Sequence, residues 1–137
     1  MMHPNQVLIN KFFDAYSKRD MPAIKDVMSD AVKWTNLGQH PYAGVRNGID
    51  EVIAFFDTMG AVMSRSNSRA ENLVTGANDK YVLECQHIWT NRTDGHNLDH
   101  LVCVLWAFEA GKIVEGRHFF ADPKATDDFF NYLATVK

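Results

Sequence analysis

The stretch KYVLECQHIWTNRTDGHNLDHLVCVLWAFEAGKIVEGRHFFAD, residues 80–122, decides the fold. It holds three runs rich in β-branched, aromatic and other apolar residues, separated by the turn signals TDG at 93–95 and EAGK at 109–112. A fourth run, RAENLVTGA at 69–77, comes before it across an Asn-Asp turn at 78–79. The second half of the chain is therefore predicted to be a meander of four long antiparallel strands.

The rest of the chain has mostly helical periodicity. Apolar spacing predicts a helix over about residues 5–18, a short one begun by Asp20, a third begun by Asn47 and a last one begun by Thr126. AVKWTNLG at 31–38 is predicted to be a short strand, and QHPYAGVRNG at 39–48 a loop. This order predicts an α+β fold, in which the N-terminal helices lie across the concave face of a curved antiparallel sheet and enclose a cone-shaped pocket.

Length and composition narrow the class of protein. The 137 residues suit one domain over residues 1–137, and the net charge of −3 comes with no run of Lys or Arg. Nucleic acid and anionic membranes are therefore not expected as partners. We find no apolar run of membrane-spanning length and no signal peptide, and two cysteines make no disulfide scaffold, so the cytoplasm is the expected location.

The last predicted strand, EGRHFFAD at 115–122, carries the clearest candidate site. Alternation places Gly116, His118, Phe120 and Asp122 on one face, which we expect to point inward. Gly116 would leave space for a ligand and Phe120 would supply a flat wall. Buried His and Asp side chains need a hydrogen bond or a function, although Asp122 before a proline is also a typical cap or turn residue, and His118 could be a satisfied core histidine.

Strand geometry excludes a direct contact within two pairs of candidate residues, His118 with Asp122 and His96 with His100. Residues four apart on a strand lie about 13 Å apart, at roughly 3.3 Å per residue. His118 and Asp122 are therefore not a directly bonded dyad. The same distance separates His96 from His100, so we predict no metal site there.

The two middle strands of the stretch offer further candidates. His100 shares a face with Val102, and both faces of that strand are apolar, so we expect one face to line the pocket and the other to pack on a second subunit. On the preceding strand His87 and Trp89 belong to the more apolar stripe, which predicts that they face the pocket, although a core role for His87 remains an alternative.

Three more residues come from the first half. Trp34 and Asn36 share a face of the first strand and could hold a flat ligand that carries an oxygen, or could merely fill the core and bind the loop backbone. Tyr16, on the apolar stripe of the first helix, is expected to place its hydroxyl at the cavity edge, or simply to pack. Phe55, Phe56 and Met59 are interpreted as core or pocket wall.

The segment FFDAYSKRDMPAIKDVMSDAVKWTNLGQHPYAGVRNGIDEVIAFF, residues 12–56, is similar to the start of the nuclear transport factor 2-like (NTF2-like) superfamily. It looks closest to the SnoaL-like (polyketide cyclase-like) and ketosteroid isomerase-like branch, and GKIVEGRHFFAD at 111–122 resembles that family's last strand. The resemblance implies a cystatin-like cone and a homodimer formed through the sheet. It is specific for fold and weak for activity, because this fold hosts many functions.

The ketosteroid isomerase mechanism, which the resemblance brings to mind, uses a carboxylate base, a tyrosine and a protonated aspartate. In this chain the position of the base falls at Thr35 or Asn36, and Phe12 stands where the tyrosine would be. The position of the protonated aspartate falls near Val104. We therefore predict against steroid isomerisation by that route. The SnoaL-like cyclases imply an acid/base role for Asp122, and the dehydratases of the superfamily imply roles for His87 and His100.

The sequence thus predicts a protein that binds a small molecule, and a cofactor-free enzyme of proton-transfer type is the leading interpretation. An isomerase, cyclase or dehydratase would act on a flat, largely apolar substrate with carbonyl or hydroxyl groups. The catalytic candidates are Asp122, His118 and His87. The substrate-binding candidates are Tyr16, Trp34, Asn36, Trp89, His100, Val102, Gly116 and Phe120. The alternative is a non-catalytic ligand-binding or dimeric assembly domain.

Overall fold

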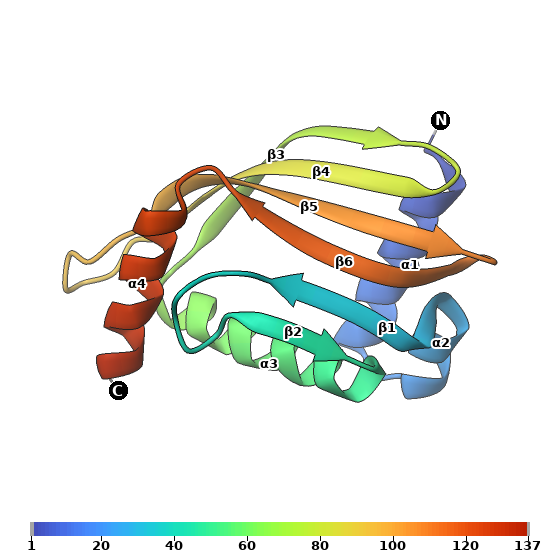
Figure 1. The fold of residues 1–137 in the computed structure, drawn as a ribbon, viewed down its shortest axis with the longest axis horizontal. Helices are drawn as coiled ribbons and strands as arrows, with labels where there is room; N and C mark the ends of the chain where they lie inside the picture. Colours follow the sequence, from blue (N-terminus) through green and yellow to red (C-terminus); the bar gives the residue numbers. More distant parts are fainter. Residues whose placement is uncertain (1, 137) are drawn as a thin grey trace.

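A computed structural model describes residues 2–136 and has a curved, open six-stranded sheet with four helices (Figure 1). In chain order the elements are α1 (Pro4–Ser17), α2 (Met21–Val27), β1 (Met28–Asn36), β2 (Gly44–Asn47), α3 (Ile49–Arg65), β3 (Arg69–Ala77), β4 (Tyr81–Trp89), β5 (Asp99–Glu109), β6 (Lys112–Phe120) and α4 (Pro123–Thr135). The predicted α+β class is confirmed, and so is the meander from β3 to β6.

The strand order is β2-β1-β6-β5-β4-β3. Strands β3 to β6 pair antiparallel with their chain neighbours, as hairpin connections require. β1, however, pairs parallel with β6, and the register sets Trp34 beside Gly116 and Thr35 beside Arg117. The first and last strands are thereby side by side in the middle of the sheet (Figure 1).

Short segments depart from the sequence prediction. The loop expected over 39–48 contains the edge strand β2, which pairs antiparallel with the end of β1. Gly48 rather than Asn47 is the N-cap of α3, and its φ of 91° is a conformation that favours glycine. Asp122 rather than Thr126 is the N-cap of α4, while the predicted cap Asp20 does begin α2.

Helices α1 and α3 cover one face of the sheet, which we call the inner face, and α4 lies at the end where β6 stops (Figure 1). The largest fully buried side chains, Trp34 and Phe12, pack between this face and the helices. A smaller cluster around Val62 and Phe130 joins α3 to α4. The inner face is therefore the core, and a hollow remains between α3, α4 and the strand ends.

Within residues 2–136, no helix combines the length and the apolar character needed to cross a bilayer.

Candidate functional site

A cavity of about 150 Å³ lies between α3, α4 and the inner face of the sheet. We call it the inner cavity. Aromatic, aliphatic and methionine side chains make most of its wall, and four polar side chains interrupt it. The lining residues are Asn36, Phe55, Phe56, Met59, Met63, Gln86, Ile88, His100, Val102, Val104, His118, Phe120 and Phe130.

His118 projects into this cavity from the middle of β6. Its Nε2 atom is inaccessible to solvent and has no hydrogen-bond partner within residues 2–136. Trp34 and Phe120 hold the imidazole in place, with ring centroids 5.7 and 5.8 Å away. Burial, and secondarily the nearby His100, lowers the pKa of His118 to about 4. At neutral pH this ring is therefore uncharged, and no described residue uses the hydrogen-bonding capacity of its Nε2.

Asn36, the last residue of β1, lines the cavity next to His118. Its side chain is buried, with 2% of the residue exposed. Nδ2 donates to the Tyr42 carbonyl at 3.5 Å, whereas Oδ1 has no partner within the described residues. The register that pairs Thr35 with Arg117 makes Asn36 and His118 the next residues along two adjacent parallel strands. The two side chains therefore project from neighbouring strands on the inner face, and each has one buried polar atom without a partner within the described residues.

His100 supplies the second imidazole, from the start of β5. Its Nδ1 lies 3.4 Å from the Thr126 hydroxyl of α4, and its ring stacks on Phe120 with a centroid distance of 6.0 Å. Burial lowers the pKa of His100, while the Asp99 and Asp122 carboxylates act in the opposite direction. No carboxylate opposes burial in this way at His118. His100 therefore keeps more basicity than burial alone would leave it.

Gly116 does not leave space for a ligand, contrary to the sequence prediction. A Cβ at this position would overlap the six-membered ring of Trp34. Trp34, with 1% of its surface exposed, fills that space and lies outside the set of residues that line the inner cavity. The two residues make one core contact across the parallel strands β1 and β6, and neither is placed to touch a ligand in the cavity.

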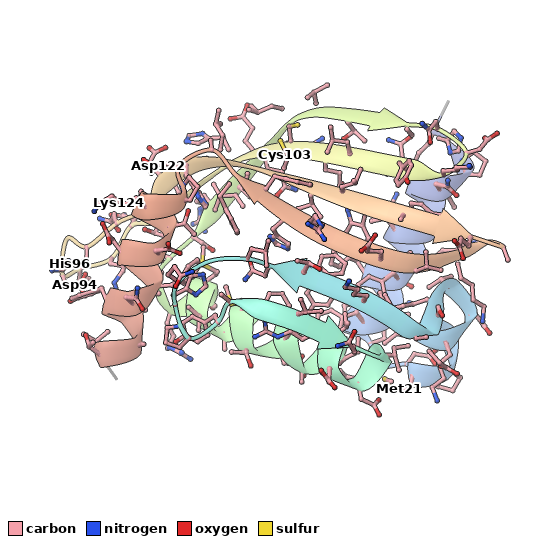
Figure 2. All side chains as sticks on the ribbon, viewed as in Figure 1. Met21, Asp94, His96, Cys103, Asp122 and Lys124 are labelled. Atoms are coloured by element: carbon pink, nitrogen blue, oxygen red, sulfur yellow. The ribbon has the colours of Figure 1, made fainter. Side chains whose placement is uncertain are left out.

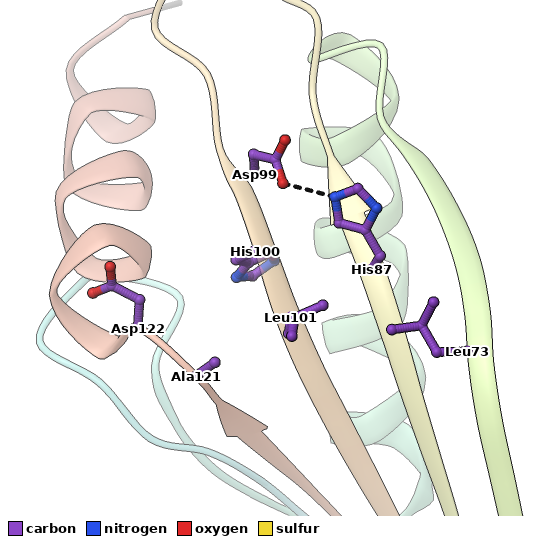
Figure 3. A pocket seen from close by; sticks show the side chains of 7 residues that line it. All are labelled: Leu73, His87, Asp99, His100, Leu101, Ala121 and Asp122. Atoms are coloured by element: carbon purple, nitrogen blue, oxygen red, sulfur yellow. Dashed lines mark hydrogen bonds and ion pairs between the residues drawn. The ribbon is translucent and has the colours of Figure 1, made fainter.

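The prediction that His87 and Trp89 face the pocket is also wrong. Gln86 and Ile88 line the inner cavity, so alternation places His87 and Trp89 on the opposite, outer face of the sheet. There the two rings stack with centroids 4.6 Å apart, and His87 Nε2 lies 2.7 Å from Asp99 Oδ1. Figure 3 shows His87 and Asp99 meeting across β4 and β5.

Asp122 also lies outside the inner cavity. It caps α4, where its carboxylate accepts a hydrogen bond of 3.0 Å from the Ala125 amide. Figure 2 shows Asp122 at the start of this helix. The residue is exposed and borders a second, open hollow of about 470 Å³. This outer pocket is lined by Leu73, His87, Asp99, His100, Leu101, Ala121 and Asp122 (Figure 3). The reading of Asp122 as a cap fits this placement better than a role as an acid inside the cavity.

Tyr16 does not reach the cavity either. Its hydroxyl donates to Asp57 on α3 at 2.6 Å, and Arg19 forms an ion pair of 2.6 Å with the same carboxylate. Burial, then the hydrogen bond to Asp57, raises the pKa of Tyr16. These contacts tie α1 to α3 at the protein surface.

Five predicted site residues thus line the inner cavity: Asn36, His100, Val102, His118 and Phe120. Phe55, Phe56 and Met59 are pocket wall, as interpreted. Gln86 and Ile88 also line the cavity, although they belong to the less apolar stripe of β4, which the sequence pattern predicts to face outward. Met63 and Phe130 gave no signal beyond ordinary helix periodicity.

The sequence predicts that His96 and His100 do not share a metal ion, because they lie too far apart on one strand. In the part of the chain from residue 2 to 136, no three His, Cys, Asp or Glu side chains converge in a group that could hold a metal ion. His96 lies in the loop between β4 and β5 and stacks on Tyr132 of α4, with ring centroids 3.7 Å apart. His100 faces the inner cavity instead.

The fold and its cavity define a class: a curved sheet with helices across one face and a small, mostly apolar chamber at one end. The sequence profile of the SnoaL-like domain matches residues 9–116, and the chain therefore belongs to the SnoaL-like family.

The chain is also similar over most of its length to a curated relative and to two solved structures. An uncharacterized protein of Mycobacterium tuberculosis is 27% identical over 124 residues, which cover 90% of this chain and 93% of the relative. Bal32a, from a soil-derived mobile gene cassette, superposes with a TM-score of 0.75 at 23% identity, covering 93% of this chain and 96% of Bal32a. An NTF2-like protein of unknown function from Burkholderia pseudomallei gives 0.72 at 20% identity, covering 94% and 98%. These structural likenesses support the fold.

Proposed function

We propose that this SnoaL-like protein binds a small molecule in the inner cavity and catalyses a cofactor-free proton transfer on it. The substrate would be largely apolar, with a carbonyl or hydroxyl group, and the reaction an isomerisation, cyclisation or dehydration. One observation carries the proposal. Two neutral imidazoles and an amide converge in an apolar chamber, and two of these three side chains have polar atoms without partners. Unpaired polar groups in such a setting typically serve a ligand.

The proposed roles follow from the pKa shifts. A neutral His118 can donate a hydrogen bond to a substrate oxygen, and it stabilises charge that develops there because the surroundings exclude water. His100, whose pKa is supported by two carboxylates, is the better base for an adjacent C–H or O–H. Asn36 would orient the substrate oxygen. Asp122 would act only indirectly, through the pKa of His100.

The ketosteroid isomerase route finds no support at the corresponding positions. Phe12 is completely buried in the core and Val104 is an apolar part of the cavity wall. Neither offers an ionisable or hydroxyl group. The proposed chemistry therefore depends on imidazoles in place of a tyrosine and two carboxylates.

The test is hydrogen exchange at the carbon next to a carbonyl. Cyclohexanone in D₂O is a probe with one ring, and NMR follows the loss of its α-protons. We expect the protein to accelerate this exchange, and His100→Gln or His118→Gln to reduce the acceleration at least tenfold, since a positioned acid or base contributes about 10²–10⁴-fold. His96→Gln, at an exposed histidine, is the matched control. Exchange at the buffer rate with every protein would refute the catalytic proposal.

A second candidate is a non-catalytic binding domain of the same fold. It is favoured by the pKa of His118, which at about 4 makes this imidazole a weak base at neutral pH. Binding of a ligand to the cavity without any hydrogen exchange in the experiment above would support this alternative.

We also propose that a second copy of the chain packs on the outer face of the sheet. Leu73, Leu101 and Phe119 are 52%, 50% and 48% exposed there, and Cys85 and Cys103 sit among them with their sulfur atoms 2.8 Å apart. Large exposed apolar patches typically mark interfaces, and a symmetric dimer requires such a patch to match itself.

A further inference from the structure

We propose that the inner cavity takes an uncharged molecule with one ring and one hydroxyl group, and that Asn36 and His118 bind this hydroxyl together. This inference rests on the proposed small-molecule binding and narrows it to one ligand class. A phenol is the simplest member of the class. The argument has three steps: the volume of the cavity, its charge and its unpaired polar atoms.

The volume sets the number of rings. The cavity measures about 150 Å³. An apolar protein cavity of about 150 Å³ binds benzene, whereas pockets for drug-sized ligands measure about 300–1,000 Å³. One six-membered ring therefore fills the space between Phe55, Phe120 and Phe130. Met59 and Met63 can adapt to a substituent, because unbranched thioether side chains adjust easily. A second fused or linked ring does not fit without opening the contact between α3 and α4.

The residues that line the cavity determine which ligand charge it can accept. No Asp, Glu, Lys or Arg is among the residues that line the cavity. Both lining histidines have lowered pKa values because they are buried, so neither carries a positive charge at neutral pH. A carboxylate or ammonium group would therefore lose its hydration without gaining a counter-charge, which is costly. This excludes benzoate-like and benzylamine-like ligands.

The polar atoms of the cavity that have no hydrogen-bond partner determine which polar group the ligand must carry. Asn36 uses its Nδ2 on the Tyr42 carbonyl and leaves Oδ1 as an acceptor, so the ligand must donate to it. His118 Nε2, protonated in the appropriate tautomer, can donate to an oxygen of the ligand. Adjacent strands are about 4.8 Å apart, so the Asn36 and His118 side chains project next to each other, and we place one ligand atom between them. A hydroxyl oxygen donates once and accepts at the same position, which satisfies both groups.

The experiment compares probes by isothermal titration calorimetry at pH 7. Phenol is expected to bind, and toluene, which has the same shape without the hydroxyl group, to bind roughly 5–100-fold more weakly, as expected for loss of two neutral hydrogen bonds. Benzoate and 4-phenylphenol are expected not to bind. In Asn36→Leu, which keeps only the hydrogen bond from His118, the preference for phenol over toluene should fall by roughly 3–10-fold. Asn10→Leu, at an exposed asparagine of α1, should keep it.

A measurement on the wild-type protein guards against a variant that fails to fold. Phenol, but not benzoate, should shift the NMR signals of the His118 ring. Equal binding of phenol and toluene to the wild type, binding of benzoate, or binding of 4-phenylphenol as tightly as phenol would each overturn the inference.

The results separate this inference from the proposed catalysis. Phenol binding without hydrogen exchange on cyclohexanone would support the ligand class and refute the enzyme. Hydrogen exchange that depends on His100, together with no binding of phenol, would overturn the ligand class and leave the enzyme standing.

Discussion

Single side chains decide which polar groups of this protein stay available for a ligand. His118 is the clearest case, because its neighbours on β6 and β1 are Phe120 and Trp34 and neither can bond its Nε2. An unbonded imidazole in such surroundings is held neutral by desolvation. The burial that keeps His118 neutral also makes the folded protein sensitive to acid.

This sensitivity has a definite sign. The pKa of His118 is about 4 in the folded protein and 6.5 in the unfolded chain. Stability from this group is therefore complete above pH 6.5 and is lost as the pH falls toward 4, because only the unfolded chain takes up the proton. Between pH 7 and pH 5 the loss is roughly 2 kcal/mol. His100 adds a loss in the same direction.

We expect His118→Phe to remove most of the part that belongs to His118. Urea unfolding at pH 7 and pH 5 measures it, with the exposed His96→Gln as the matched control. If wild type and His118→Phe lose the same free energy of unfolding on acidification, the imidazole is not buried in its neutral form.

Gly116 makes a second prediction at this scale. Because a Cβ there overlaps the Trp34 ring, Gly116→Ala should lower the free energy of unfolding by about 1–3 kcal/mol, as overpacking does. Gly76→Ala is a matched control, since Gly76 also lies in a strand and a Cβ there meets nothing within 4 Å. Denaturant midpoints of the two variants give the comparison. Equal midpoints would contradict the tight contact between β1 and β6.

Among the elements, α4 shows how structural and catalytic interpretations of one residue can be separated. Asp122 accepts from the Ala125 amide and begins the helix that carries Phe130 into the cavity wall. Asp122→Ala should cost about 1 kcal/mol through the lost N-cap, and Asp122→Ser should restore most of it. Asp128→Ala on the same helix removes only an exposed ion pair with Lys124 and should be almost neutral. Hydrogen exchange of the α4 amides measures the effect. Unchanged protection in Asp122→Ala would contradict the capping role.

The elements themselves could be predicted well from local patterns, and the faces of the strands only in part. The inward stripe of β6 carries His118 and Phe120 as expected, because the outward stripe holds Glu115 and Arg117. On β4 the rule that the more apolar stripe is buried fails. Its outward stripe, with Leu83 and Trp89, is the more apolar one, while Glu84 and Gln86 face inward.

Two inner-face contacts explain that exception. Glu84 accepts a hydrogen bond of 2.7 Å from Trp106 Nε1, and Gln86 borders the cavity. A polar inward stripe beside an apolar outward one fits the two proposals above, a ligand site on the inner face and a second copy on the outer face. Hydrophobicity along a single strand cannot distinguish these two uses.

At the scale of the whole molecule, the site depends on a pairing that no local pattern encodes. Asn36 and His118 are separated by most of the chain and meet because β1 inserts parallel to β6. Hairpin signals predict neighbours in sequence, and a parallel pair needs a long connection that leaves no turn signature. The cavity could therefore be anticipated from the order of elements, but its pair of unbonded polar atoms could not.

The outer face leads to the last prediction. A second copy that packs there would cover Leu73, Leu101 and Phe119, which are about half exposed in a single chain. A lysine at Leu101 would bury an unpaired charge in that contact, which costs far more than the same change on open surface. We therefore expect the wild type to sediment as a dimer in analytical ultracentrifugation and Leu101→Lys to sediment as a monomer with its fold intact by circular dichroism. Leu37→Lys is the control, since Leu37 is 58% exposed in the loop after β1, away from the outer face. A monomeric wild type, or a Leu101→Lys variant that stays dimeric, would show that the outer face is not the interface, and the apolar stripe of β4 would then need another explanation.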